Sequence, residues 1–114
     1  MTYIGIQTLP NVFIDNNSKE TIKDITFWYE GLSSKEPKIK NLKPGERKHV
    51  AVYTRGIQGK RTLYMKHVDY SDQIQMYDIF NQLTKDYWSD ILVEIKSIKE
   101  DGTLNIIVTP NFDF

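Results

Sequence analysis

Short runs in which apolar and polar residues alternate recur along the whole chain. In residues 21–30 the side chains of Ile25, Phe27 and Tyr29 fall on one face of a strand, while Trp28 falls on the opposite, otherwise polar face. Clusters of Gly, Pro, Asn and Asp separate the runs. This pattern is typical of a β-sandwich or a β-barrel, so it predicts an all-β chain. Trp28 should then meet a second layer or lie exposed.

The alternation and the turn residues together give the expected strands. We expect them at residues 3–7, 11–15 and 21–30, around Ile39, and at 47–54, 61–68, 73–79, 89–99 and 103–109. Pro10 interrupts the first two and suggests a bulged or edge strand, because a central strand does not easily hold proline. One segment also has helical spacing, which leaves open a single helical turn within 80–87; the spaced residues are Met76, Phe80, Leu83 and Tyr87.

The C-terminal strands are expected to form a hairpin around Asp101-Gly102, a pair that favours a tight two-residue turn. With these two residues as the loop, the register predicts the opposed pairs Ile95–Val108 and Ser97–Ile106. The same register predicts one continuous apolar face made of Ile91, Val93, Ile95, Ile106 and Val108.

Two strands in the middle of the chain have one aliphatic face and one face of cations and aromatic rings. A turn at Pro44-Gly45 starts the strand at 47–54, whose aliphatic face carries Val50 and Val52. Its opposite face carries Arg47, His49 and Tyr53. The strand at 61–68 has Leu63 and Met65 on one face, with Tyr64 and Lys66 on the other. The aliphatic faces should point inward, which leaves the cations and rings outside.

Three short motifs resemble those of bacterial immunoglobulin-like β-sandwich modules. They are the hydrophobic strand and polar turn at residues 12–18, the Leu-Lys-Pro-Gly-Glu turn at 42–46, and the run at 59–69. The resemblance implies a single immunoglobulin-like β-sandwich of about seven to eight mostly antiparallel strands. It also implies that strands 47–54 and 61–68 lie in opposite sheets, so that their aliphatic faces meet. The cysteine pair and core tryptophan of antibody domains are absent, so no antibody-type relation is implied.

Length and composition are those of one globular domain. The chain has 114 residues, of which 39% are hydrophobic and 26% charged, so we expect a single domain over residues 1–114 that buries its own core. The absence of cysteine excludes disulfides, a thiol nucleophile and a sulfur-ligated zinc site. The N-terminal residues lack the basic start and apolar run of a signal peptide, and no segment approaches about 18 consecutive apolar residues. We therefore expect a cytoplasmic protein that does not enter a membrane.

The formal net charge of zero conceals a segregation of charge along the chain. Residues 35–66 carry ten basic side chains against two acidic ones, a net charge of +8. Residues 67–114 carry three against nine, and residues 1–34 two against four, so both flanks are acidic. Such segregation suits the steering and orientation of a protein partner. The isoelectric point of about 6.7 falls short of the strongly basic balance expected of a nucleic-acid-binding domain.

Sequence motifs for catalysis are absent. The chain contains no Gly-x-Ser-x-Gly elbow, glycine-rich phosphate loop or His-Glu-x-x-His pattern. His67 with Asp69 and Asp72 matches no defined ligand set. Asp86 and Asp90 flank Tyr87-Trp88, but paired carboxylate catalysis needs a cleft with shifted pKa values. The sequence therefore predicts a protein that is not an enzyme and that uses neither cofactor nor metal.

The predicted function is non-enzymatic protein–protein interaction, as a small intracellular interaction protein, an inhibitor or an accessory module. The candidate binding residues are Arg47, His49, Tyr53, Arg61, Tyr64 and Lys66 in the basic segment, with Tyr87 and Trp88 as a second contact surface. Two alternatives stay open: nucleic-acid binding through residues 35–66, and an extracellular module that binds a ligand or glycan. The sequence leaves the oligomeric state open, and it does not decide whether the basic residues form one patch or two.

Overall fold

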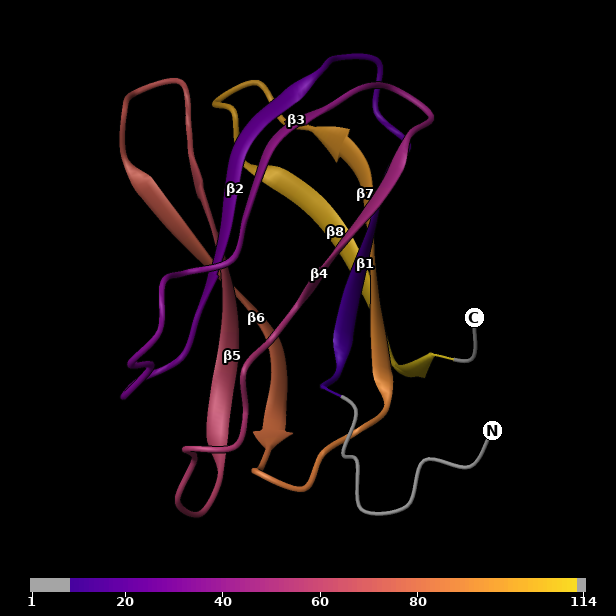
Figure 1. Ribbon diagram of the computed structural model, residues 1–114. Helices are drawn as coiled ribbons and strands as arrows, with labels where there is room; N and C mark the ends of the chain where they lie inside the picture. Colours follow the sequence, from indigo (N-terminus) through magenta and orange to yellow (C-terminus); the bar gives the residue numbers. More distant parts are fainter. Residues whose placement is uncertain (1–8, 113–114) are drawn as a thin grey trace.

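The computed structural model describes residues 9–112, and these residues contain strands and turns without any helix (Figure 1). The strands are β1 (Asn11–Asn16), β2 (Ile22–Trp28), β3 (Lys38–Leu42), β4 (Arg47–Ala51), β5 (Arg61–Val68), β6 (Ile74–Leu83), β7 (Asp90–Ile98) and β8 (Leu104–Phe112). The predicted all-β class is confirmed. The expected strand at 3–7 lies outside the described residues.

The strands form two four-stranded sheets that pack face to face as a sandwich (Figure 1). Sheet A has the order β4-β1-β7-β8, and sheet B has the order β3-β2-β5-β6. All neighbouring strands are antiparallel except β1 and β7, which are parallel. As expected, β4 and β5 belong to opposite sheets.

The space between the sheets is filled by aliphatic and aromatic side chains from both. Val52, Leu63 and Met65 are buried in one cluster, and Val50 packs against it, as the alternation of these two segments predicts. Ile25, Phe27 and Tyr29 are buried in the same cluster. Removing side chains of this size from water supplies the main favourable free energy of folding. The sandwich core is thus built from the inward faces read from the sequence.

A buried asparagine joins two turns at one end of the sandwich. Asn16 is completely buried, and its amide nitrogen donates hydrogen bonds to the carbonyls of Glu20 and Leu42, both at 2.8 Å. Its backbone accepts from the amide of Gly45 at 2.7 Å and donates to the carbonyl of Glu46 at 3.0 Å. The turn after β1 and the Pro-Gly turn between β3 and β4 are therefore held together by one residue.

Pro10 does not mark an edge or bulged strand, so that expectation is wrong. The strand that follows it, β1, is central in sheet A and pairs with β4 and with β7. Pro10 precedes the first ladder residue, where its missing N–H breaks no sheet hydrogen bond. Its carbonyl still accepts from the amide of Val52 at 3.0 Å.

The segment that the spacing left open to a helical turn is extended. The strand β6 runs to Leu83, beyond the expected end at residue 79, and a turn closed by Tyr87 N–H and the Thr84 carbonyl follows. The pairing of β5 with β6 shifts register near Leu63, where Leu63 faces Phe80 and Tyr64 faces Asp78. Such a bulge breaks the period of two and produces a spacing that imitates a helix.

The C-terminal hairpin is present, but its predicted register is wrong. Lys99 N–H pairs with the Thr103 carbonyl, so the loop has three residues, and Gly102 adopts a left-handed φ of +89°. This is the geometry of a tight turn closed by a left-handed glycine. A further shift between Ile95 and Ser97 gives the observed pairs Ile95–Ile106, Ser97–Asn105 and Val93–Val108. The predicted apolar face survives, because Ile106 and Val108 pack against the buried side chains of β7.

The described residues form no helix that is long and apolar enough to cross a membrane.

Candidate functional site

The basic segment is divided between the two sheets. Residues 35–66 contribute β3 and β5 to sheet B and β4 to sheet A. Because the polar faces of β4 and β5 point outward from opposite layers, their cations do not form a single patch. The candidate residues of this segment therefore lie at three separate places.

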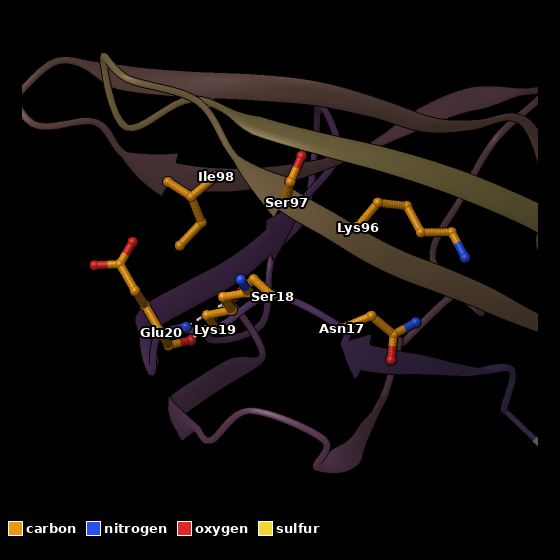
Figure 2. Close-up of a pocket in the computed structure, with 7 residues that line it drawn as sticks. All are labelled: Asn17, Ser18, Lys19, Glu20, Lys96, Ser97 and Ile98. Carbon is orange, nitrogen blue, oxygen red and sulfur yellow. Dashed lines mark hydrogen bonds between the residues drawn. The ribbon is translucent and has the colours of Figure 1, made fainter.

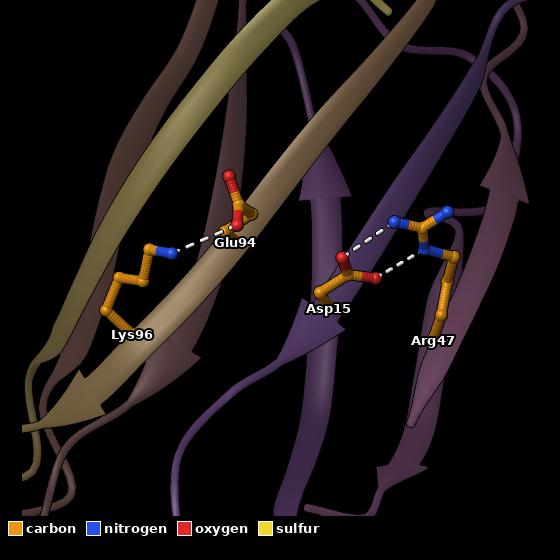
Figure 3. A network of polar contacts seen from close by, with 4 residues as sticks. All are labelled: Asp15, Arg47, Glu94 and Lys96. Carbon is orange, nitrogen blue, oxygen red and sulfur yellow. Dashed lines mark hydrogen bonds and ion pairs between the residues drawn. The ribbon is translucent and has the colours of Figure 1, made fainter. Parts of the chain in front are cut away.

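Arg47 and His49 lie on the outer face of sheet A, in contact with their own chain. The guanidinium of Arg47 donates to both carboxylate oxygens of Asp15, at 2.5 and 2.8 Å (Figure 3). This hydrogen-bonded pairing raises the pKa of Arg47. The ring of His49 lies 5.1 Å from the ring of Phe13, and Arg47 lies 5.5 Å from the ring of Phe112. Both predicted binding residues are thus engaged in packing this face.

Tyr53 follows the end of β4, and Arg61 is the first residue of β5, so both lie at the same end of the sandwich. The Tyr53 carbonyl accepts a 2.7 Å hydrogen bond from the hydroxyl of Tyr29. Burial is the main cause that raises the pKa of Tyr29, and the nearby Arg61 lowers it in part. Arg61 Nε donates to the carbonyl of Glu30 at 3.1 Å. The bond from Tyr29 to Tyr53 connects the two sheets, whereas the bond from Arg61 to Glu30 connects the start of β5 to the segment after β2, within sheet B.

Tyr64 and Lys66 lie on the outer face of sheet B beside Trp28. The rings of Trp28 and Tyr64 stack with centroids 6.1 Å apart and planes inclined by 27°. Lys66 Nζ lies 5.9 Å from the centroid of the Trp28 ring and 2.7 Å from a carboxylate oxygen of Glu36. A cation between an aromatic face and a carboxylate is held in place by both. The question left by the sequence about Trp28 is answered: it stacks on the outer face instead of entering the core.

An exposed aliphatic cluster continues this face toward the tip of the β5–β6 hairpin. Register pairs Lys66 with Met76 and Val68 with Ile74, so these side chains share the outer face. Their exposed fractions are 47% for Met76, 43% for Val68 and 66% for Ile74. We define the docking face as six residues: Trp28, Tyr64, Lys66, Val68, Ile74 and Met76. Exposed apolar side chains gathered beside polar ones mark interaction surfaces more often than scattered ones do.

The docking face ends at the edge strand β6, whose only charged side chain is Asp78. Edge strands are commonly blunted by lysine, proline or other charges. Among the sheet edges, β3 carries Lys38 and Lys40, β4 carries Arg47 and Lys48, and β8 contains Pro110. The ten residues of β6 contain no Lys, Arg or Pro. The β6 edge is therefore the one of these four edges that is best suited to accept another strand.

Sequence reasoning missed Val68, Ile74 and Met76. The available signal was the turn at 69–73, where the Asp69 carboxylate accepts from the amides of Ser71 and Gln73. A hairpin centred on that turn would have paired Val68 with Ile74 and Lys66 with Met76. The sequence predicts strands at 61–68 and 73–79 on either side of this turn, but no register was predicted for the pair.

Tyr87 and Trp88 lie in the loop between β6 and β7, at the opposite end of β6 from the hairpin tip. Tyr87 is half-buried, with its ring centroid 4.6 Å from that of Phe80. Trp88 is 72% exposed and lines a shallow hollow. The two neighbours in sequence thus have different roles, one in packing and one on the surface.

A second hollow, of about 280 Å³, lies between the turn after β1 and the end of β7 (Figure 2). Residues 17–20 and 96–98 line it, and none of the eight predicted binding residues does. Glu20 at its rim accepts a 3.1 Å hydrogen bond from the hydroxyl of Tyr70. This hollow has no aromatic side chain in its lining on which the ring of a ligand could stack.

His67 lies on the inner side of β5, close to the tip of the β5–β6 hairpin. Burial lowers its pKa below the ordinary value of 6.5, although Asp24 and Asp69 act in the opposite direction. Its Nδ1 atom is buried and has no hydrogen-bond partner within residues 9–112. Across that same range, no three His, Cys, Asp or Glu side chains are close enough to hold a metal ion.

Comparison with known proteins gives a fold relationship. No protein-family model and no curated protein matches this chain. An NMR structure of a protein from Eubacterium rectale is similar, with a TM-score of 0.57, 14% sequence identity, and coverage of 95% of this chain and 94% of that one. At this identity the likeness supports a shared arrangement of strands in two packed sheets, and it carries no information about function.

Proposed function

We propose that this protein is a non-catalytic protein-binding module that engages its partner through the docking face and the adjacent β6 edge. The observation that carries the proposal is the cluster of exposed Val68, Ile74 and Met76 at an edge strand, β6, that contains no lysine, arginine or proline. We also propose that the protein acts inside the cell.

The chemistry of the docking face suits a protein partner. Tryptophan, tyrosine and long aliphatic side chains bury large areas, and aromatic residues are enriched among the residues that dominate binding free energy. Lys66 is already paired with Glu36, and Asp78 faces Tyr64 across the strands, so the face has no concentration of unpaired positive charge. This mixture favours a protein over a nucleic-acid backbone, whose binding depends on neutralised phosphates.

The partner that fits is an extended strand with apolar side chains at alternate positions. Such a strand can pair with the main chain of β6, and its alternate side chains then extend the apolar face of Ile74 and Met76. Main-chain hydrogen bonds would supply affinity, and the side chains would supply specificity.

We also propose that the sandwich is a variant of the immunoglobulin-like architecture. The placement of β4 and β5 in opposite sheets supports this assignment. So does Asn16, which connects two of the motifs that carry the resemblance, the turn after β1 and the Leu-Lys-Pro-Gly-Glu turn.

A selection from a displayed library of random 12-residue peptides tests the binding proposal. Peptides selected on the wild-type protein should have apolar residues at alternate positions. Replacing Ile74 and Met76 together by Lys should weaken their binding at least tenfold, since lysine is the side chain that natural edges use against pairing. Ile107→Lys is the matched control, because Ile107 is 50% exposed on β8 at the edge of the other sheet.

The Ile107→Lys control distinguishes binding at the β6 edge from a general effect of an added lysine. Peptides that bind the double variant as tightly as wild type, or that lose affinity equally with Ile107→Lys, would contradict the proposal. Thermal unfolding of each variant shows whether the fold is retained.

A further inference from the structure

The loop between β6 and β7 carries the most exposed of the large apolar side chains in the described part of the chain. Trp88 is 72% exposed, and the protein core does not include it. The loop lies at the end of the sandwich opposite the β5–β6 hairpin tip (Figure 1), so it is separate from the docking face. An indole ring presented in this way is available to a ligand.

The loop that carries Trp88 is held in place by contacts of the neighbouring residue, Tyr87. Tyr87 packs on Phe80, and its hydroxyl donates to Asn111 Oδ1 at 3.2 Å. In return the Asn111 N–H donates to the same hydroxyl at 3.3 Å, while Asn111 keeps a left-handed φ of +54°. This pair of hydrogen bonds ties the loop to the end of β8. A binding site that is ordered before the ligand arrives loses less entropy on binding.

Polar side chains surround the indole in a hollow of about 440 Å³, which is within the range of small-ligand sites. Its lining consists of Thr84, Asp86, Tyr87, Trp88, Ser89 and Asn111. Among residues 9–112, the Asp86 carboxylate, the Ser89 hydroxyl and the Asn111 Nδ2 amide form no hydrogen bond with one another or with other groups. The hollow therefore combines one flat apolar surface with unused donors and acceptors.

We propose that this hollow binds a neutral carbohydrate, with one pyranose ring stacked on the indole of Trp88. A pyranose with equatorial hydroxyls presents a face of C–H groups and a rim of hydroxyls. The C–H face matches the aromatic surface, while Asp86 accepts from the hydroxyls and Asn111 Nδ2 donates to them. At the position beside the indole, where Asp86 is the only charged residue of the lining, its carboxylate disfavours the acidic group of a uronic acid, a sulfated sugar or a nucleotide, because like charges repel.

A neighbouring hollow gives the ligand a direction in which to extend. The neighbouring hollow, of about 530 Å³, shares Thr84 and Asp86 with the Trp88 hollow and is also lined by Lys85 and residues 57–60. A second sugar unit that leaves the indole past Asp86 would enter it. An oligosaccharide should therefore bind more tightly than a monosaccharide.

NMR titration of the 114-residue chain with neutral oligosaccharides tests the site. The probes are cellohexaose, xylohexaose, mannohexaose and chitohexaose, with glucuronic acid oligomers and oligothymidylate as charged comparisons. At least one neutral hexasaccharide should give saturable shifts at residues 84–89 and Asn111, with a dissociation constant on the order of 0.1 to 1 mM. Trp88→Ala should weaken binding at least tenfold, and Trp88→Tyr should keep part of the affinity because a ring remains.

The other tryptophan supplies the control. Trp28→Ala, on the docking face, should leave the sugar affinity unchanged. The inference is overturned if no neutral sugar shifts the Trp88 loop, if Trp88→Ala binds as wild type does, or if only a charged probe depends on Trp88. Ile74→Lys with Met76→Lys should also leave sugar binding intact, so failure of the docking proposal and failure of this one are distinguishable.

Discussion

The side-chain amide of Asn16 donates a 2.8 Å hydrogen bond to the carbonyl of Leu42, and both residues are completely buried. A second bond from the same amide reaches Glu20. These contacts join the turn after β1 to the turn before β4, which start from opposite sheets. One amide side chain therefore holds one end of the sandwich together.

Asn16→Ala should lower the free energy of unfolding by about 2–3 kcal/mol, because it leaves buried carbonyl groups without donors. Urea denaturation measures the change. Asn17→Ala is the matched control, since Asn17 is exposed, and it should change stability by less than about 0.5 kcal/mol. Equal stability of the two variants would contradict the role given to Asn16.

Gly102 should tolerate substitution less well than other glycines with positive φ. A Cβ atom at Gly102 would lie 2.5 Å from the backbone nitrogen of Tyr70, whereas one at Gly59 would meet nothing within 4 Å. Gly59→Ala should cost about 1–2 kcal/mol from its left-handed backbone alone. Gly102→Ala should cost clearly more, because the turn must also move away from Tyr70. Urea denaturation of both variants gives the comparison, and equal losses would show that the contact with Tyr70 is unimportant.

The hydrogen bond between the sheets from Tyr29 to the Tyr53 carbonyl should be visible in a pair of tyrosine variants. Tyr29→Phe removes the donor beside a carbonyl at the edge of the core and should cost about 1–2 kcal/mol of unfolding free energy. Tyr53→Phe keeps that carbonyl and should change stability by less than about 0.5 kcal/mol. Chemical denaturation measures both. The reverse order of effects would rule out this bond as a significant link.

Stability should fall when the pH drops below about 6.5, and His67 should be one cause. Burial lowers the pKa of His67 in the folded state, so the unfolded chain binds the proton more readily. The stability that the neutral His67 side chain contributes is fully present above its ordinary pKa of 6.5. It is lost as the pH falls through the lower pKa of the folded state. Asp69 and Asp101 have lowered pKa values as well, but they act only below about pH 4.

His67→Gln should reduce the loss of stability between pH 7 and pH 5 relative to wild type, as measured by urea denaturation across this range. An unchanged pH dependence in His67→Gln would refute the explanation.

The sequence predicted the inward faces well and the registers poorly. Period-two alternation identified Val52, Leu63, Met65 and Phe27 as core residues, because burial on one side of a sheet imposes that period directly. The one register that was predicted, in the C-terminal hairpin, failed at Gly102, and the strand end expected at residue 79 failed near the β5–β6 bulge. At both places an irregularity displaces the pairing without changing which side chains are apolar. Local backbone irregularities of this kind leave little trace in residue type.

The candidate sites were only partly predictable for a related reason. Tyr64, Lys66 and Trp88 stood out by residue type, and they do lie on the surface. The sequence could not show that β4 and β5 separate Arg47 and His49 from Tyr64 and Lys66, because this depends on the sheet to which each strand is assigned. The aliphatic part of the docking face depends on the β5–β6 register, and that register was not known from the spacing alone.

The most direct test of the docking proposal is hydrogen exchange of backbone amides with a selected peptide bound. If the peptide adds a strand to sheet B, amides in β6 should gain protection, because a new ladder covers its free edge. The amides of β3, β4 and β8, at the other edges, should exchange as in the free protein. Protection that appears at one of those strands, with none at β6, would contradict the account.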